Sequence, residues 1–291
     1  MRWIDRCLNS LLASTIANHV LVIDNSSDDG TAEHIKTHFP SVQLICSSVN
    51  LGFGAANNIG FQKALDMNAD YVFLLNQDAS IEPNTIKILT DSAGKYPEYG
   101  VLSPMHWNGN ADSLEIKFNE YLNPENTPKL VSDFITQQPI KQIYESQFIN
   151  AAAWLLPINT INEIGGFDPL FYHYGEDEDY VRRLRYNGFK IGIVPLSLIY
   201  HDTNFKSWDD IKWNFKRMVI IQFLEIKRID IPLRSALLKY YKDKFNRLTD
   251  LFIYRKWREF IFLFRVVIKT TIEIPKVKLA RRKSIIKKAF L

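Results

Sequence analysis

The chain has 291 residues, of which 46% are hydrophobic and 23% charged, so it contains enough apolar side chains for a sizeable core. Two cysteines cannot form a disulfide framework, no apolar run is long enough for a transmembrane helix, and no secretory signal pattern is present; together these features favour a reducing, cytoplasmic location. The net charge of +4 conceals an asymmetry, because residues 205–291 carry 23 Lys and Arg against 8 Asp and Glu, a balance of +15, which leaves −11 for residues 1–204.

The first part of the chain alternates between helical and strand patterns. Apolar residues at helical spacing predict a helix over 3–12, and a β-rich run that ends in a dense turn signal predicts a strand over 20–24. The same reasoning gives a helix over 31–38, a strand over 42–45, a small-residue loop over 50–60 that leads into a helix through Asp66, and a strand over 71–76. This alternation is typical of a parallel α/β sheet with covering helices.

Two of the predicted strands run directly into a carboxylate. Five large apolar residues at 71–75 precede Asn76, Gln77 and Asp78, and the strand at 20–24 ends in Asp24. Because open α/β sheets bind ligands at the carboxyl ends of their strands, both carboxylates are candidates for a nucleotide or cation site. Mg²⁺ and Mn²⁺ take oxygen ligands and bridge carboxylates to phosphates. The alternative is that each Asp caps a turn or a helix.

The loop over 50–60 is rich in glycine and alanine. Gly52, Gly54 and Gly60 permit close approach of a ligand to the backbone, and the following helix directs free N–H groups at any phosphate. The segment lacks the spacing of the dinucleotide fingerprint. A tight contact between the helix and its neighbours explains the glycines equally well.

The middle of the chain, over 105–147, is polar and weakly periodic, and no element is placed there. After it the patterns predict a strand over 148–156, a helix over 159–164, an acidic helix start at 175–179, a strand over 191–195, and a helical, basic region beyond His201.

Four consecutive carboxylates, from Glu176 to Asp179, stand at the predicted helix start. They complement the helix dipole, which is the structural interpretation. Mutual repulsion also raises the pKa of one carboxyl toward that of a useful base, which is the functional interpretation. Asp177 and Asp179 are too close in sequence to share one helix face, so only part of the cluster can serve a site.

The segment after Tyr254 combines apolar residues at helical spacing with basic residues, among them Trp257, Phe260 and Phe264 with Arg258 and Arg265. Such a segment suits the interface of an anionic leaflet, which predicts peripheral attachment to the inner face of the cytoplasmic membrane. An ordinary helical hairpin packed on the body is the alternative.

Five segments in order resemble the inverting family-two glycosyltransferases of the GT-A fold: VIDNSSDDGT, NLGFGAANNIG, LLNQD, GGFDPLFYHYGEDEDYVRRL and the closing Tyr200-His201. The resemblance covers about residues 3–204. It implies a mixed α/β sheet with helices on both faces over 1–204 and a basic, amphipathic helical region over 205–291.

The resemblance also assigns roles. Asp177 is implied as the general base, and Asp78 and His201 as ligands of Mg²⁺ or Mn²⁺. Substrate contacts are implied for Asp24, Asn25, Asn50, Gly52, Gly54, Asn57, Asn76, Gln77, Asp168 and Glu176.

The chain departs from the family at two places. The family's metal motif is Asp-x-Asp, whereas Asn76-Gln77-Asp78 retains only the last carboxylate, a variant most like bacterial rhamnosyltransferases that use dTDP-rhamnose. The family also opens with a hydrophobic strand, whereas this chain begins inside the first predicted helix. We therefore expect this chain to be weakly active, since an incomplete sheet exposes strand edges.

The sequence thus predicts an inverting, metal-dependent glycosyltransferase that moves rhamnose from dTDP-rhamnose to a glycan or lipid-linked glycan in bacterial surface polysaccharide synthesis. A nucleotide-sugar-binding relative without activity is the first alternative, favoured by Asn76 and the absent strand. A nucleic-acid-binding protein is disfavoured, because the basic residues are mixed with large apolar ones and the acidic body repels phosphates. No nucleic-acid partner is expected, and the sequence does not indicate an oligomeric state.

Overall fold

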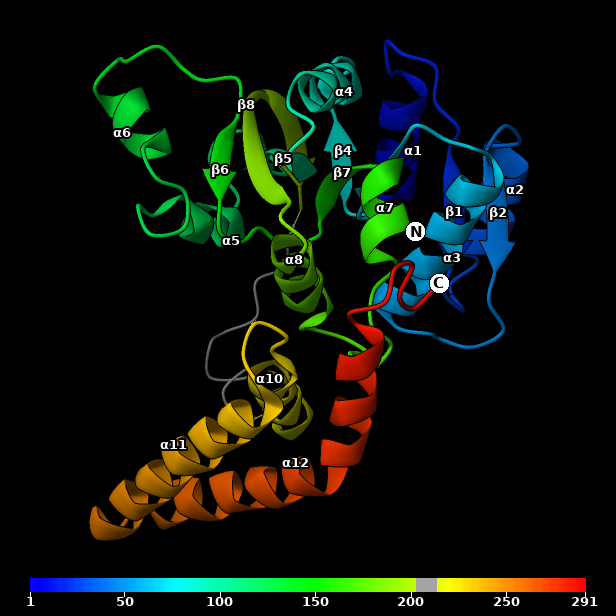
Figure 1. The fold of residues 1–291 in the computed structure, drawn as a ribbon. Coiled ribbons are helices and arrows are strands. Elements are labelled where there is room, and N and C mark those ends of the chain that lie inside the picture. The colour runs from blue at the N-terminus through cyan, green and yellow to red at the C-terminus, as the bar shows by residue number, and fades with distance from the viewer. Residues whose placement is uncertain (203–213) are drawn as a thin grey trace.

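A computed structural model describes residues 1–202 and 214–291 (Figure 1). The first elements are α1 (Ile4–Leu12), β1 (Leu21–Asp24), α2 (Thr31–His38), β2 (Gln43–Cys46), α3 (Phe53–Asp66), β3 (Tyr71–Leu75) and β4 (Ala79–Ile81). The predicted alternation is confirmed up to β3. Strand β4 was missed, because a three-residue strand next to Pro83 reads as a turn and owes its conformation to pairing with a distant strand.

Helix α4 (Thr85–Lys95) and strand β5 (Tyr99–Asn108) follow β4. The weakly periodic middle over 105–147 contains the end of β5 and then only short elements: α5 (Ile116–Asn119), the 3₁₀ turn η1 (Glu120–Leu122), α6 (Leu130–Ile135) and β6 (Tyr144–Ser146). The body is completed by β7 (Ala153–Pro157), α7 (Ile158–Ile164), α8 (Glu176–Tyr186) and β8 (Lys190–His201). The predicted strand over 148–156 is shorter than expected, and the strand over 191–195 is longer, because β8 continues through Tyr200 and His201.

The described strands form two sheets. One has the order β3-β7-β5-β8-β4 with β6 beside β8, and the other pairs β1 with β2 in parallel. Within the larger sheet β5 and β8 are parallel, whereas β3 with β7 and β4 with β8 are antiparallel. The sheet is therefore mixed, as the resemblance implied, rather than parallel, as the alternation alone suggested. Among the described strands, β1 and β3 each pair along one edge only.

Aromatic residues fill the core between the larger sheet and helices α3, α7 and α8. Trp154 and Phe167 stack at 6.2 Å between ring centroids, Phe61 stacks on Phe167 at 5.6 Å, and Tyr180 lies 5.1 Å from Phe167. All four side chains are fully buried. This core holds the start of α8 against the sheet, and so positions the acidic cluster.

Three helices follow the body: α10 (Phe215–Lys227), α11 (Leu233–Ile253) and α12 (Trp257–Lys283). Helix α10 packs below α8, whereas α11 and α12 form an antiparallel hairpin that projects from the body (Figure 1). The second half of α12, which contains Pro275, turns back toward α7 and α3, as a proline within a helix favours. None of the described helices is long and apolar enough to cross a bilayer. The proposed boundary at 204/205 lies outside the described residues.

Candidate functional site

Strand pairing brings Asp78 and His201 together. Strand β4 begins at Ala79, which lies opposite His201 in the antiparallel pairing with β8. As a result His201 Nε2 lies 3.2 Å from Asp78 Oδ1, and the Asp202 amide donates to the Asp78 carbonyl oxygen at 2.9 Å. The His201 side chain is 4% exposed and that of Asp78 26%. One carboxylate oxygen and one imidazole nitrogen thus meet at an accessible rim, a donor set that suits Mn²⁺ better than the harder Mg²⁺.

Two further side chains lie behind His201, and sequence reasoning missed both. His106, Glu115 and His201 each have a potential ligand atom within 4.8 Å of the others, and all three residues are buried. Burial, and secondly the nearby His201, lowers the pKa of His106 well below its usual value. Nδ1 of His106 and Nδ1 of His201 are buried without a hydrogen-bond partner in the described part of the chain. No periodic pattern or motif marks residues 105–115, so this cluster could not be predicted before the fold was known.

Asp177 and Glu176 occupy the first turn of α8, and burial raises the pKa of both carboxyl groups. Burial raises the pKa of Asp177 to about 6, although a hydrogen bond from the Glu178 amide at 2.8 Å acts in the opposite direction. Burial, and then the charge of Asp177, raises the pKa of Glu176 to about 7. Glu176 Oε2 is buried and has no hydrogen-bond partner among the described residues. Asp177 therefore combines a base-like pKa with a half-buried position.

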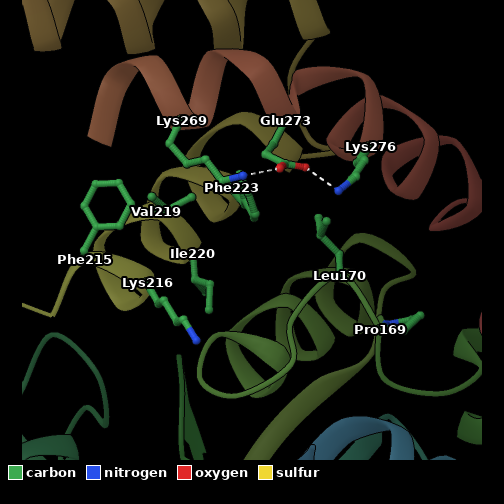
Figure 2. Close-up of a pocket in the computed structure, with 10 residues that line it drawn as sticks. All are labelled: Pro169, Leu170, Phe215, Lys216, Val219, Ile220, Phe223, Lys269, Glu273 and Lys276. Carbon is green, nitrogen blue, oxygen red and sulfur yellow. Dashed lines mark hydrogen bonds and ion pairs between the residues drawn. The ribbon is translucent and has the colours of Figure 1, made fainter. Parts of the chain in front are cut away.

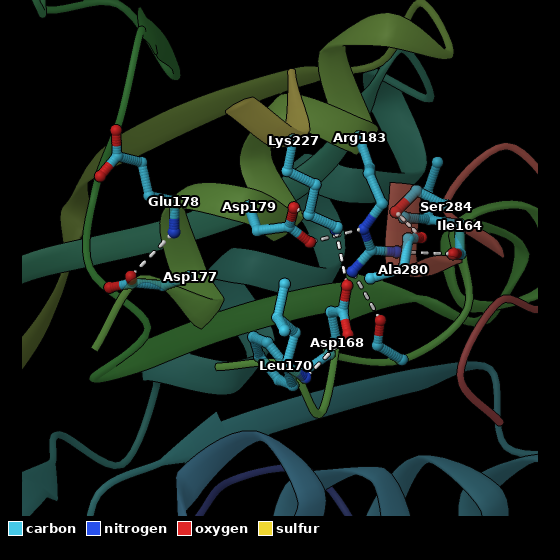
Figure 3. A network of polar contacts seen from close by, with 12 residues as sticks. Ile164, Asp168, Leu170, Asp177, Glu178, Asp179, Arg183, Lys227, Ala280 and Ser284 are labelled. Carbon is cyan, nitrogen blue, oxygen red and sulfur yellow. Dashed lines mark hydrogen bonds and ion pairs between the residues drawn. The ribbon is translucent and has the colours of Figure 1, made fainter. Parts of the chain in front are cut away.

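Asp179 points away from Asp177 into an ion cluster (Figure 3). Its carboxylate accepts from Arg183 Nε at 3.0 Å and from Lys227 Nζ of α10. Lys227 also lies 2.8 Å from Asp168 Oδ2, and Arg183 donates to the carbonyl oxygens of Ile164 and Gly166. This cluster, missed by sequence reasoning, joins α8, α10 and the turn after α7. Asp179 therefore serves packing, whereas Asp177 has no part in this cluster, and its role as a base stays a prediction.

Asp168 belongs to the same ion cluster through its pairing with Lys227. The side chain is 2% exposed, and it accepts from the Leu170 amide at 2.9 Å besides pairing with Lys227. A direct contact of Asp168 with substrate therefore stays a prediction, and the contacts seen are those of a residue that fixes the turn.

The carboxyl end of β1 carries a hydrogen-bonded loop. Asp24 is 6% exposed and accepts from the Ser27 amide at 3.3 Å. Asn25 accepts from the Leu51 amide at 2.7 Å and donates to Asn50 Oδ1 at 3.1 Å, and Tyr172 donates to the same oxygen at 3.0 Å. The predicted nucleotide-side residues are thus brought together, with the β1 turn, the glycine loop and the 170–174 segment in contact.

Packing requires two of the three glycines of that loop, whereas a Cβ on Gly60 would meet nothing within 4 Å. Gly52 has φ +81°, and a Cβ there would lie 2.1 Å from the Tyr172 carbonyl oxygen. A Cβ on Gly54 would lie 2.8 Å from the Phe167 Cβ. The packing interpretation therefore accounts for both positions. Helix α3 begins at Phe53, so Gly54 and Asn57 are helical, and the Asn57 side chain donates to the Phe53 carbonyl oxygen.

Asn76 and Gln77 lie between β3 and Asp78. The Asn76 amide donates to the Ala152 carbonyl oxygen at 2.9 Å, whereas the Gln77 side chain is exposed on the same rim as Asp78. Cys7 packs beneath Asn76, and burial, with a smaller effect of Asp78, raises the pKa of its thiol to about 12, which disfavours the reactive thiolate.

Residues 2–142 match the family model for glycosyl transferase family 2. N-acetylglucosaminyl-diphospho-decaprenol L-rhamnosyltransferase of Mycobacterium tuberculosis H37Rv is 26% identical over 225 residues, which are 68% of this chain and 71% of the relative. The S. aureus TarS 1–349 structure in complex with UDP has a TM-score of 0.54 at 16% identity, and the match covers 98% of this chain and 84% of TarS 1–349. The structure of GalNAc-T7 with UDP, GalNAc and Mn²⁺ also has a TM-score of 0.54 at 16% identity, and the match covers 83% of this chain and 51% of that one.

Proposed function

We propose that this protein transfers L-rhamnose from dTDP-rhamnose, with inversion, to a lipid-linked glycan of a bacterial surface polysaccharide. The premise is that residues 2–142 match the glycosyl transferase family 2 model in a chain of GT-A fold, so the protein is a glycosyltransferase. The observation that carries this proposal is that Asp78 and His201 meet at the sheet rim, in the same fold that presents a base-like carboxylate at Asp177. The LLNQD variant and the mycobacterial rhamnosyltransferase support rhamnose.

Asp78 and His201 would hold Mg²⁺ or Mn²⁺. The carboxylate oxygen suits both cations, the imidazole nitrogen favours Mn²⁺ over the harder Mg²⁺, and Asp78 is exposed enough to meet a diphosphate. When bound, such a cation neutralises charge on the departing nucleoside diphosphate. The carboxylate of Glu115, near His201, matches the acidic partner that commonly orients a metal-binding histidine.

Asp177 would act as general base in a single displacement. The acceptor hydroxyl oxygen attacks the anomeric carbon of the donor sugar, the bond from that carbon to the diphosphate oxygen breaks, and the hydroxyl proton passes to the Asp177 carboxylate. One substitution at the anomeric carbon inverts its configuration. Asp24 and Asn25, at the end of β1, would contact the nucleotide.

The acceptor is proposed to be a sugar linked through a diphosphate to a polyprenyl lipid. The name of the mycobacterial relative states such an acceptor, and the glycosyltransferase body of this chain carries a basic, helical C-terminal region that suits a membrane-bound substrate.

Release of dTDP from dTDP-rhamnose in the presence of a polyprenyl-diphosphate-linked GlcNAc is the test. We expect acceptor-dependent release that requires Mg²⁺ or Mn²⁺ and stops with EDTA, and an NMR coupling that shows inverted configuration in the product. UDP-GlcNAc and UDP-GalNAc serve as control donors. Turnover with either of them in place of dTDP-rhamnose would refute the donor assignment, and nucleotide binding without turnover of any donor would favour the inactive relative.

The hairpin supports attachment to the inner face of the cytoplasmic membrane. We define its tip as residues 252–257, which join α11 to α12 farthest from the body (Figure 1). The tip exposes large apolar side chains, with Ile253 65%, Tyr254 72% and Trp257 50% exposed, beside exposed Arg255 and Lys256. Apolar residues flanked by cations suit insertion into an anionic leaflet.

Replacing Phe252 and Trp257 together by Ser is expected to weaken binding to phosphatidylglycerol-containing vesicles by at least about tenfold, since burying each side chain contributes roughly 1.5–3 kcal/mol. Flotation on a density gradient measures this, with Leu196→Ser as a control that removes a 71%-exposed apolar side chain from the body. Flotation of the double variant equal to that of the wild type would contradict the membrane role of the tip. So would a wild-type protein that dimerises and does not float.

A further inference from the structure

A cavity of about 420 Å³ lies between the turn after α7 and the helices α10 and α12 (Figure 2). Its apolar lining includes Leu170, Phe215, Ile220 and Phe223. Both the volume and the mainly apolar surface are in the range of sites that bind small molecules. None of the roles proposed above uses this cavity.

The rim of the cavity is cationic. Lys216, Lys269 and Lys276 line it together with a single carboxylate, Glu273. Glu273 pairs with Lys269 and with Lys276, each at 2.7 Å, whereas Lys216 makes no ion pair with any residue that the structure describes. Three ammonium groups against one carboxylate leave an excess of positive charge beside an apolar surface, which suits an anion attached to a hydrocarbon.

The cavity adjoins the start of the catalytic helix. At Gly175, the residue before Glu176, a Cβ would lie 3.2 Å from Ile220 and 3.3 Å from Leu224, so α10 packs directly against the α8 N-terminus. Arg182 of α8 donates to the Leu224 carbonyl oxygen at 2.6 Å and fixes this contact. Ile220 therefore borders both the cavity and the turn that carries Asp177.

Helix α12 links the cavity to the hairpin tip. Lys269, Glu273 and Lys276 come from the same helix whose first residue, Trp257, is exposed at the tip. A lipid held in the leaflet at the tip thus has a continuous helix surface leading to the cavity.

We propose that this cavity binds the polyprenyl diphosphate part of the acceptor, with the hydrocarbon on Leu170, Ile220 and Phe223 and the diphosphate at Lys216 and Lys276. This inference rests on the proposed function, because it names the binding site of the acceptor that the glycosyltransferase would use. It places the sugar that follows the diphosphate toward Asp177.

Direct binding of geranylgeranyl diphosphate, measured by fluorescence titration below its micelle concentration, tests the site without requiring transfer. We expect Lys216→Ala/Lys276→Ala to weaken binding about tenfold or more, because each lost contact to a charged group weakens binding by that order. Lys278→Ala is the matched control, since Lys278 is exposed on α12 but does not line the cavity. Geranylgeraniol and inorganic diphosphate, which each carry half of the ligand, should bind the wild type more weakly than the whole.

Leu170→Trp supplies a second variant that fills the apolar part and leaves the lysines in place. Weakened binding of geranylgeranyl diphosphate by both variants, with dTDP binding unchanged, would support the site. Wild-type affinity in both variants would overturn it, even if rhamnosyl transfer is observed. Conversely, binding that depends on the cavity in a protein that transfers no rhamnose would retain the lipid site and refute the proposed donor.

Discussion

Replacing Asp177 by Asn is expected to lower kcat for sugar transfer by roughly 10²–10⁴, the usual contribution of a general base. The amide of Asn cannot take the proton of the acceptor hydroxyl, whereas its oxygen can still accept the hydrogen bond from the Glu178 amide. The fold and the nucleotide site should therefore persist. Steady-state transfer and dTDP binding are the two measurements, and loss of the first with retention of the second is the expected pair.

Glu178→Gln is the matched control, because it changes the next carboxylate, which pairs with Arg182 on the helix surface. The pH profile gives an independent check. A base must be ionised to accept a proton, so wild-type kcat should fall as pH drops through the pKa values of about 6 and 7 shared by Asp177 and Glu176, and should level off above them. A D177N enzyme that retains wild-type kcat would exclude Asp177 as the base.

Replacing Lys227 by Met is expected to destabilise the protein by about 3–5 kcal/mol, the cost of leaving a buried charge without its partner. Lys227 is 2% exposed and lies between the carboxylates of Asp168 and Asp179. Met keeps the approximate length of the side chain and removes its charge. The buried carboxylates of Asp168 and Asp179 then have only the Arg183 guanidinium as a nearby cation in the cluster. At about 2–4 °C per kcal/mol for a chain of this size, the melting temperature should fall by about 10 °C.

Lys244→Met is the control for this prediction. Lys244 pairs with Glu225 at 3.2 Å, but Glu225 is 42% exposed, and such surface pairs contribute about 0–1 kcal/mol. Calorimetry of both variants should show a large drop for Lys227→Met and a change of no more than a few degrees for Lys244→Met. Equal melting temperatures would mean that the ion cluster does not hold the C-terminal helices to the body.

The helices and strands that were predicted from the sequence are mostly those whose apolar residues recur at the spacing of a helix or of a strand. Helix α2 was predicted at its observed bounds, and β3 differs by one residue, because local pattern and tertiary position agree there. Strand β4 and the elements over 105–147 were not placed, since they are short and depend on partners distant in the chain, as when Ala79 pairs with His201.

Among the candidate site residues, too, those marked by a local pattern were predicted, and those that depend on distant segments were not. Asp24, Asp78 and His201 were singled out because strand ends are recognisable in sequence, and the contact of Asp78 with His201 follows from where those strands end. Lys227 and Glu115 were missed, since each joins the site only through folding of segments that carry no motif. The catalytic roles of all these residues stay predictions that the proposed substitutions test.

The length of helix α12 fixes the distance between the hairpin tip and the cavity. Helix α12 runs from Trp257 at the tip to Lys276 at the cavity and bends near Pro275, so a rise of 1.5 Å per residue gives about 29 Å of helix between the two, measured along the bent axis. The hairpin therefore sets the distance between the tip and the cavity. Lengthening α11 and α12 together by one turn would move the tip outward by about 5.4 Å while leaving every side chain of the cavity in place. The number of residues in α11 and α12, more than their identity, determines the distance from the tip to the cavity.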